Sequence, residues 1–211
     1  LFYMSIYGLP CTEMFWGNET RIPKVADVMS RNRWQAIKTN IHLNDNSTSG
    51  QTSDKLFKLR PFLDSLSNNF QKIPIDEKVC VDEQIIPFKG KHSLKMYVKN
   101  KPKKWGYKVF ALCDCSGVLL KFEIYTGKEE HDSELPDVGV SGNVVLRLTK
   151  ILQKHMNHKV YYDNWFSSVN LIVELEKMGI QSLGTVRPNR LPGCSFTSDK
   201  EMKRQGRGTV E

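Results

Sequence analysis

The stretch Lys159-Val-Tyr-Tyr-Asp-Asn-Trp-Phe-Ser-Ser168 decides the fold of this chain. Its first four residues are typical of a short strand, which delivers Asp163 at its far end. Two aromatic residues and two serines then indicate that the strand ends and that a helix begins at about Ser168. An earlier segment, Lys78-Val-Cys-Val-Asp-Glu-Gln-Ile-Ile86, predicts a partner strand with Asp82 in its middle.

The two aspartates suggest a metal site. Burying a charged acid in an apolar strand is costly unless another group compensates for the lost water. A divalent ion shared by Asp82 and Asp163 would compensate, whereas each residue could also be a turn acid or a paired surface acid. Glu83 follows Asp82 directly, but side chains alternate along a strand, so Glu83 faces the other side and is not expected to be a ligand.

Three other polar residues could contribute to a site, but each has a simpler interpretation. Asp114 lies between two predicted strands, where an aspartate is typical of a hairpin turn. His155 and His158 are close enough in sequence to bind one metal, although the solvated end of a helix explains them better. None of the three is therefore expected to be catalytic.

The residues directly after Asp163 have less certain roles. Asn164 is a candidate hydrogen-bond partner for the metal ligands. Trp165 and Phe166 fit either core anchors or base-stacking groups, and core anchors are the simpler interpretation because large aromatic rings dominate cores.

Residues 1–75 are predicted to form a helical lobe. A helix is expected to start at Pro23, because proline is well tolerated in a first turn. The polar segment 44–50 predicts a loop, and another helix is expected from about Pro61. Apolar residues recur at helical spacing in both: Val25, Val28, Met29, Trp34, Ile37 and Ile41, then Phe62, Leu63, Leu66 and Phe70.

From residue 76 the apolar pattern changes to a period of two, which predicts strands. The expected order is an antiparallel meander of three strands, followed by helix, strand, helix and strand. Strand-helix-strand units favour parallel pairing through a right-handed crossover. Residues 76–211 are therefore predicted to form an α/β domain with a mixed sheet. The expected strands are 78–86, 94–98, 105–113, 118–125, 159–163 and 181–186, a surface loop covers 126–141, and the helices are 144–156 and 168–178.

The charge of the chain is concentrated in one block. The net charge is +8, from 31 lysines and arginines against 23 acids, and residues 89–108 hold eight lysines and no acid. Without this block the rest of the chain is neutral. A concentrated basic block suits a polyanion such as nucleic acid, and a solvated lysine-rich hairpin is the alternative.

The cysteines indicate the cellular compartment of the protein, and the chain ends indicate a fragment. Five cysteines without framework spacing favour reduced thiols in an intracellular protein. No apolar run approaches the about 18 residues of a membrane span. The sequence has neither an initiator methionine nor a signal peptide, and both ends look like the middle of an element, so a fragment cut at both ends is expected.

Four ordered segments resemble the piggyBac transposase family, including its domesticated, transposase-derived members. They are Val81-Asp-Glu-Gln-Ile-Ile-Pro-Phe-Lys-Gly90, Met96-Tyr-Val-Lys-Asn-Lys-Pro-Lys-Lys-Trp-Gly-Tyr-Lys108, Tyr162-Asp-Asn-Trp-Phe-Ser-Ser168 and Leu183-Gly-Thr-Val-Arg187. Two earlier segments look like the N-terminal helical region of that family, Met29-Ser-Arg-Asn-Arg-Trp34 and Ile41-His-Leu-Asn-Asp45. The order and spacing of these motifs make the resemblance specific, and it covers nearly the whole chain.

The resemblance implies an RNase H-like core in which three aspartates hold two divalent metals, normally Mg²⁺. The first two match Asp82 and Asp163, and the third is expected beyond Glu211, as is a cysteine-rich zinc-binding domain. Such enzymes cut DNA at transposon ends and join the freed 3′-hydroxyl into TTAA targets. The family acts as a dimer, and a nuclear location is expected. With two acids only, the fragment alone should be nearly inactive.

The basic residues near the two predicted acidic strands are expected to contact DNA phosphates. Contacts of this kind give affinity and salt dependence but not sequence specificity. The residues concerned are Lys99, Lys101, Lys103, Lys104, Arg187 and Arg190.

Three functions stay open at this point. The first is an active DDE transposase, which the presence of both aspartates favours. The second is a domesticated relative that binds DNA or chromatin without catalysis. The third is an unrelated RNase H-like nuclease, although such enzymes often carry a second acid soon after the first, whereas the gap here runs from residue 82 to residue 163.

Overall fold

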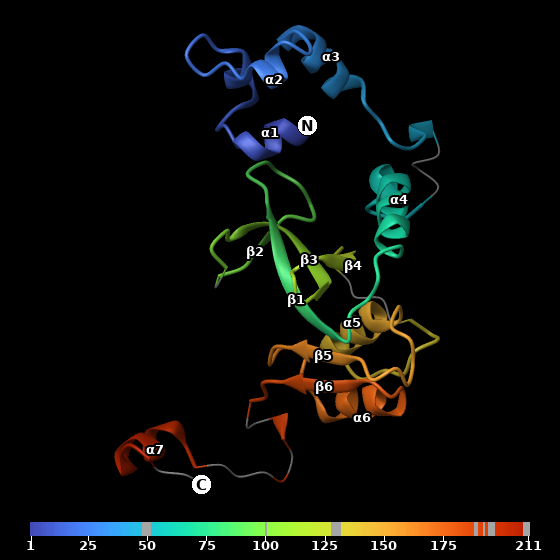
Figure 1. Ribbon diagram of the computed structural model, residues 1–211, viewed down its shortest axis with the longest axis vertical. Helices are drawn as coiled ribbons and strands as arrows, with labels where there is room; N and C mark the ends of the chain where they lie inside the picture. Colours follow the sequence, from blue (N-terminus) through green and yellow to red (C-terminus); the bar gives the residue numbers. More distant parts are fainter. Residues whose placement is uncertain are drawn as a thin grey trace. The chain divides into compact units, whose positions relative to one another are not determined.

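The structure is a computed structural model that describes residues 1–47, 52–99, 101–127, 132–187, 190–191, 193 and 197–208 (Figure 1). The chain forms two compact units, Leu1–Phe62 and Leu63–Glu211, and each is described by itself. The predicted division into a helical lobe of residues 1–75 and a catalytic core of residues 76–211 stays a prediction.

The described part of unit 1 has helices as its only regular elements. Ser30 caps α3, because its side chain accepts a hydrogen bond from the main-chain amide of Arg33. The apolar series that starts at Pro23 therefore spans two helices, which corrects the single helix expected there. The elements are α1 (Phe2–Tyr7), the 3₁₀ helix η1 (Thr12–Trp16), α2 (Pro23–Ala26), α3 (Arg31–Asn40) and the 3₁₀ helix η3 (Phe57–Leu59).

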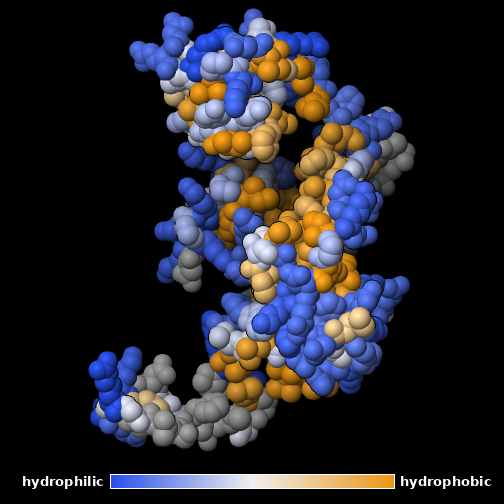
Figure 2. All heavy atoms as spheres, viewed as in Figure 1, coloured by the Kyte–Doolittle hydropathy of each residue, from blue (hydrophilic) through white to orange (hydrophobic). Residues whose placement is uncertain are grey.

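Helix α4 (Arg60–Phe70) confirms the helix predicted from about Pro61. Figure 2 shows hydrophobic side chains along one side of this helix and hydrophilic ones along the other. At its end the ring of Phe70 meets Phe122 edge to face, with 6.0 Å between ring centroids. This aromatic contact packs the C-terminal end of the helix against the sheet of unit 2.

Unit 2 contains a six-stranded sheet in the order β2-β3-β1-β5-β6, with β4 paired to β3. The pairs β1–β3 and β3–β4 are antiparallel, whereas β1, β5 and β6 are parallel (Figure 1). This confirms the predicted α/β class with a mixed sheet. The strands are β1 (Lys78–Pro87), β2 (Met96–Tyr97), β3 (Trp105–Asp114), β4 (Leu119–Ile124), β5 (Lys159–Tyr162) and β6 (Gln181–Gly184).

One face of the sheet packs against α5 (Val140–Thr149) and α6 (Val169–Lys177), and the core lies between them. Strand β1 alternates as predicted, with Val79 and Val81 each 1% exposed. Apolar burial of this kind is the main stabilising contribution to folding. The other face of β1 carries Cys80 and Asp82, which are exposed.

The ends of α6 agree with the helix predicted for 168–178. Ser168 caps the helix by accepting a hydrogen bond from the amide of Leu171 at 3.2 Å. Gly179 follows the helix with a φ of 68°, the left-handed conformation that glycine adopts at little cost.

The helix predicted at 144–156 is wrong at its C-terminal end, because α5 ends at Thr149. His155 and Asn157 both have left-handed backbones, with φ values of 58° and 61°, so the chain turns here instead of continuing as a helix. His158 is buried at 8% exposure, and its Nδ1 lies 3.2 Å from the main-chain oxygen of Asp76. The solvated helix end predicted for His158 is therefore also wrong.

The remaining elements add little to the site. Helix α7 (Asp199–Gln205) is capped by Ser198. Cys11, Cys80, Cys113 and Cys115 are free thiols, and Cys194 lies outside the described residues. In the part of the chain that the structure describes, no helix combines the length and the apolarity needed to cross a membrane.

Candidate functional site

Asp82, within β1, and Asp163, directly after β5, lie next to each other where the parallel ladder between these two strands ends. The ladder between β1 and β5 ends at the pair Val81 and Tyr162, and the aspartates are the next residue on each strand. Neighbouring strands are about 4.8 Å apart. Val81 and Tyr162 point into the core, so both aspartates extend from the opposite face. The carboxyl ends of parallel strands are a common place for ligands in α/β proteins.

Both aspartates are exposed, which corrects the argument from burial. The side chain of Asp82 is 64% exposed, and Asp163 is exposed as well. The core lies on the other face of the sheet, so these carboxylates keep their water and need no metal to compensate for its loss. The case for a metal site therefore rests on their proximity.

The carboxylate of Asp163 is held by the turn that follows it. Its Oδ1 accepts a hydrogen bond from the amide of Trp165 at 2.8 Å. The hydroxyl of Ser167 donates to the main-chain oxygen of Thr185 at 2.6 Å and also contacts that of Asp163 at 3.1 Å. Ser167 is buried, so these bonds tie the turn to the segment after β6.

The aromatic residues of the turn are core anchors, as predicted. Phe166 is fully buried. Trp165 stacks on Phe110 of β3 with 5.6 Å between ring centroids and an angle of 13° between the planes. Lys108 covers this pair, with its Nζ 4.4 Å from the centroid of the Trp165 ring. The turn after Asp163 is thus seated on β3.

Gly184 of β6 allows the turn and β5 to approach closely. A Cβ at this position would lie 2.6 Å from Ser167 Oγ and 2.6 Å from the ring of Tyr162. Close packing next to the site therefore explains the glycine in the motif Leu183-Gly-Thr-Val-Arg187.

Arg190, which was predicted to bind DNA, braces the same turn. One nitrogen of its guanidinium donates to the main-chain oxygens of Asn164 at 2.6 Å, Trp165 at 3.0 Å and Ser167 at 3.2 Å. Donors engaged in this way are poor phosphate ligands, so this geometry does not support the predicted DNA contact. Asn164 takes part through its main chain, and the role predicted for its side chain stays a prediction.

Lys101 is a basic residue that reaches the acidic side chains of β1. Its Nζ lies 3.0 Å from Glu83 Oε1 and 3.9 Å from Asp82 Oδ2. Burial alone would lower the pKa of Lys101, but the hydrogen bond to Glu83 and the negative charges of Asp82, Glu83 and Asp163 outweigh this effect and raise the pKa. The side chain of Glu83 is 17% exposed and shares the Lys101 ammonium with Asp82, so the opposite orientation predicted for Glu83 is not supported.

The other predicted DNA contacts lie on the surface. Lys99, Lys103 and Lys104 are exposed in the connection between β2 and β3, and Arg187 is exposed after β6. Their role in DNA binding stays a prediction. Asp114 is a hairpin residue, as predicted, because its Oδ1 accepts hydrogen bonds from the amides at positions 116 and 118, each at 2.8 Å.

An exposed aromatic pair that flanks these lysines was not predicted from the sequence. Tyr97 of β2 and Trp105 of β3 are cross-strand partners with ring centroids 4.9 Å apart, and they are 50% and 54% exposed. Lys95 lies over the Trp105 ring at 5.0 Å. Alternation of aromatic and basic residues was the available signal, but the pairing of the two rings depends on a register that the sequence does not reveal.

The two aspartates fit part of a magnesium site. Mg²⁺ prefers oxygen ligands and usually needs only one or two carboxylates beside water and phosphate. In the described residues, no cluster of three or more His, Cys, Asp or Glu side chains is arranged to hold a metal. The donor set thus supplies two of the three predicted ligands.

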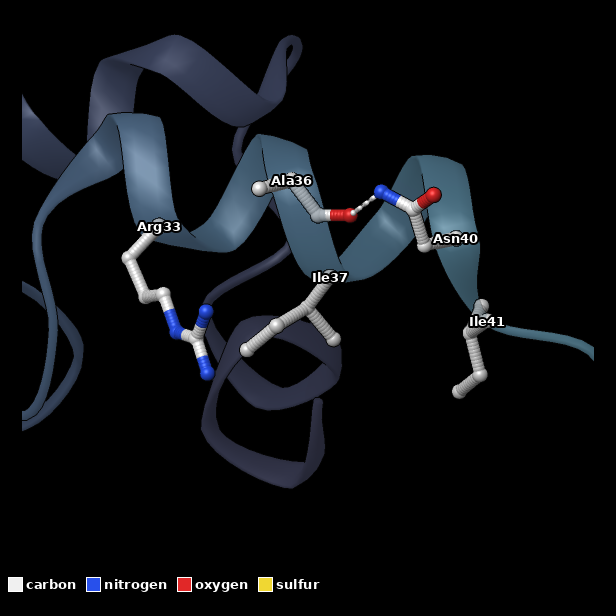
Figure 3. Close-up of a pocket in the computed structure, with 5 residues that line it drawn as sticks. All are labelled: Arg33, Ala36, Ile37, Asn40 and Ile41. Atoms are coloured by element: carbon white, nitrogen blue, oxygen red, sulfur yellow. Dashed lines mark hydrogen bonds between the residues drawn. The ribbon is translucent and has the colours of Figure 1, made fainter.

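A hollow along α3 in unit 1 has a different character. It is lined by Arg33, Ala36, Ile37, Asn40 and Ile41, and the Asn40 amide donates to the main-chain oxygen of Ala36 at 2.7 Å (Figure 3). Its lining consists of one basic, one amide and three apolar side chains.

Comparison with known proteins supports the resemblance noted in the sequence. The family model described as Transposase IS4 matches residues 1–210. PiggyBac transposable element-derived protein 3 of Homo sapiens is 30% identical over 216 residues, covering 100% of this chain and 36% of that protein. PiggyBac transposable element-derived protein 2 of Homo sapiens is 31% identical over 209 residues, covering 96% of this chain and 35% of that protein.

The fold also resembles a solved structure, the cryo-EM structure of the piggyBac transposase synaptic complex with hairpin DNA. The TM-score is 0.75 at 23% identity, and the match covers 95% of this chain and 41% of that chain. This chain therefore spans well under half of the length of these relatives. Because the family model and both human relatives match along almost all of its residues, the chain belongs to the piggyBac transposase family.

Proposed function

We propose that this chain is part of a piggyBac-like DDE transposase, which cleaves DNA strands and transfers them to a target. The observation that carries the proposal is the placement of Asp82 and Asp163 directly after the last residue pair of the parallel ladder between β1 and β5. These residues also stand in the motifs that resemble the first two metal-binding aspartates of the family. The conclusion for the whole protein is a proposal, because the chain covers 36% of the first human relative.

The arrangement of the sheet supports an RNase H-like core. Antiparallel β1, β3 and β4 are followed by β5 and β6, which run parallel to β1. In this proposal residues 76–211 form the core, and residues 1–75 form a helical lobe for dimerisation or DNA binding. A third acidic ligand would come from outside the described residues.

The chemistry follows from the two acids at the end of the parallel ladder. When bound, two divalent ions, Mg²⁺ in this proposal, would stabilise the attacking and leaving oxygens of a phosphodiester displacement. Asp82 and Asp163 supply carboxylate oxygens for them. The amide of Trp165 orients the Asp163 carboxylate, and Arg190 holds the turn behind it. Water attacks in the cleavage reaction, and the freed 3′-hydroxyl attacks in the transfer reaction.

The surface around β2 and β3 is the proposed DNA interface. The exposed lysines of the connection neutralise phosphates. Tyr97 and Trp105 offer exposed ring faces on which an unpaired base can stack. A solved structure with a similar fold is a transposase complex with hairpin DNA, so a DNA partner is consistent with this surface. Transposon ends, a TTAA target, a homodimer and a nuclear location complete the proposal.

A second candidate is a domesticated protein that binds DNA or chromatin without cleaving it. Both human relatives are named as transposable element-derived proteins, which favours this possibility. It predicts the same salt-sensitive DNA binding without any metal-dependent nicking.

Strand cleavage by the complete protein that contains this chain distinguishes the two. With transposon-end DNA and Mg²⁺, Asp82→Asn and Asp163→Asn should each abolish cleavage. The control variant Asp64→Asn, an exposed acid of α4, should cleave like the wild type. Cleavage that survives in either site variant would refute the site, and DNA binding without cleavage by the wild type would favour the second candidate.

A further inference from the structure

Lys101 places an ammonium group at the point where the ladder between β1 and β5 ends. Besides its ion pair with Glu83 Oε1 at 3.0 Å, its Nζ donates to the main-chain oxygen of Glu83, also at 3.0 Å. The same nitrogen is 3.9 Å from Asp82 Oδ2. The side chain is only 29% exposed, in contrast to the exposed lysines at positions 99, 103 and 104 of the same connection.

Electrostatics explain why an ammonium belongs here. Asp82, Glu83 and Asp163 bring three carboxylates close together, and each acts on the charge of Lys101. Like charges at such separations repel, and a nearby cation relieves the repulsion. Lysine is a compact point charge on a flexible stem, so it can occupy this position and also leave it without moving the backbone.

We propose that Lys101 is the resting counter-ion of the Asp82–Asp163 pair and gives up its place beside Asp82 when a divalent cation binds. It is thus a positioning residue that sets the metal affinity of the site. The inference rests on the proposed metal role of the two aspartates. It adds that metal binding is a cation exchange, in which the ammonium leaves the carboxylates and becomes free to turn to a phosphate oxygen of the substrate.

The exchange has a direct consequence for metal affinity. An ammonium 3.9 Å from Asp82 competes with any cation for the same oxygen. Replacing Lys101 by methionine, which has a similar length and no charge, removes the competitor. The dissociation constant for Mn²⁺ should then fall about fivefold, the upper end of what a partly exposed ion pair contributes.

The test is a Mn²⁺ titration of the complete protein, followed by water proton relaxation, which detects weak binding. The Asp82→Asn/Asp163→Asn double variant defines the binding that belongs to other sites and is subtracted. Lys103→Met is the matched control, because it removes the same charge from the same connection at an exposed position. The inference predicts a clear gain in affinity for Lys101→Met and little change for Lys103→Met.

The outcomes separate the inference from the proposed function. Aspartate-dependent binding with equal affinities in Lys101→Met and Lys103→Met would overturn the role of Lys101 and leave the metal site intact. If Lys101→Met and Lys103→Met bind Mn²⁺ no more tightly than the Asp82→Asn/Asp163→Asn double variant does, both the role of Lys101 and the proposed metal site are wrong.

A measurement on the wild-type protein avoids any effect of the substitution on folding. Acylation of lysine amines by a small reagent, read by mass spectrometry, reports how free each ammonium is. Adding Mn²⁺ should increase the rate of Lys101 acylation by about fivefold, the same factor as the expected change in metal affinity. The rate of Lys103 acylation should stay constant. An unchanged or slower rate at Lys101 would contradict its displacement.

Discussion

The guanidinium of Arg190 lies 2.6 Å from the main-chain oxygen of Asn164, the residue that directly follows Asp163. A basic residue that the charge pattern assigns to DNA thus holds the turn of a proposed catalytic acid. The function of the site depends on such bracing, because a ligand on a loop needs fixed partners to keep its geometry.

Arg190→Ala should destabilise the protein and loosen this turn. Hydrogen bonds from a charged donor contribute about 1.5–3 kcal/mol, so the free energy of unfolding in urea should fall by about that amount. Arg187→Ala is the control, since an exposed arginine without such bonds should change stability by less than about 0.5 kcal/mol. Equal effects of both substitutions would show that Arg190 does not brace the turn.

Trp105→Ala should weaken binding to DNA that contains unpaired bases. Stacking of a base on an aromatic ring contributes about 1–3 kcal/mol, so affinity should fall at least about fivefold. Fluorescence anisotropy with a labelled single strand and a fully paired duplex measures the difference. Val118→Ala, another exposed apolar position, is the control. A loss of the same size for the duplex would argue against base stacking.

Replacing Lys103 and Lys104 by alanine should reduce the salt dependence of DNA binding. Each phosphate contact contributes about 0.9 to the slope of log K against log salt, so the slope should become shallower by about 1.8. Lys154→Ala, which removes an exposed charge far along the chain, should leave the slope unchanged. An unchanged slope in the double variant would place the DNA path elsewhere.

The ion pair between Asp54 and Arg60 should make stability depend on pH. The Arg60 hydrogen bond lowers the pKa of Asp54 against a smaller opposing effect of burial. A lowered pKa in the folded state adds stability above the usual pKa of the acid, and this stability disappears as pH falls through the folded value. The pair is partly exposed, so Asp54→Asn should cost about 0.5 kcal/mol at pH 7.

Urea unfolding of the wild type and Asp54→Asn at several pH values measures this effect. The two curves should converge as the pH falls below the usual aspartate pKa of 3.8, where Asp54 becomes protonated in the folded protein too. A stability difference that persists at low pH would assign the effect of the substitution to something other than the charge.

Local signals in the sequence predicted much of the fold. The period of two predicted the strand 78–86, which is β1, and the helix predicted for 168–178 contains α6. These features are predictable because each depends on neighbours within one element. The turn at His155 was missed, because its left-handed residues, His155 and Asn157, are not glycines.

The finer structure of the site depends on contacts between distant residues. Lys101 reaches Glu83 across 18 residues, and Arg190 reaches Asn164 across 26. From the sequence, Lys101 and Arg190 were both predicted to contact DNA, because a positive charge does not reveal which group it will bind. The exposure of Asp82 was missed for a related reason, since apolar neighbours in a strand do not show which face is covered.

The central claim is that Asp82 and Asp163 are metal ligands for DNA strand cleavage. The most direct test replaces each by cysteine in the complete protein and compares cleavage of transposon-end DNA in Mg²⁺ and in Mn²⁺. Thiolates are poor ligands for magnesium and better ones for softer ions. We predict that both variants are inactive in Mg²⁺ and regain cleavage in Mn²⁺. Full activity in Mg²⁺, or inactivity that Mn²⁺ leaves unchanged in both, would contradict the claim.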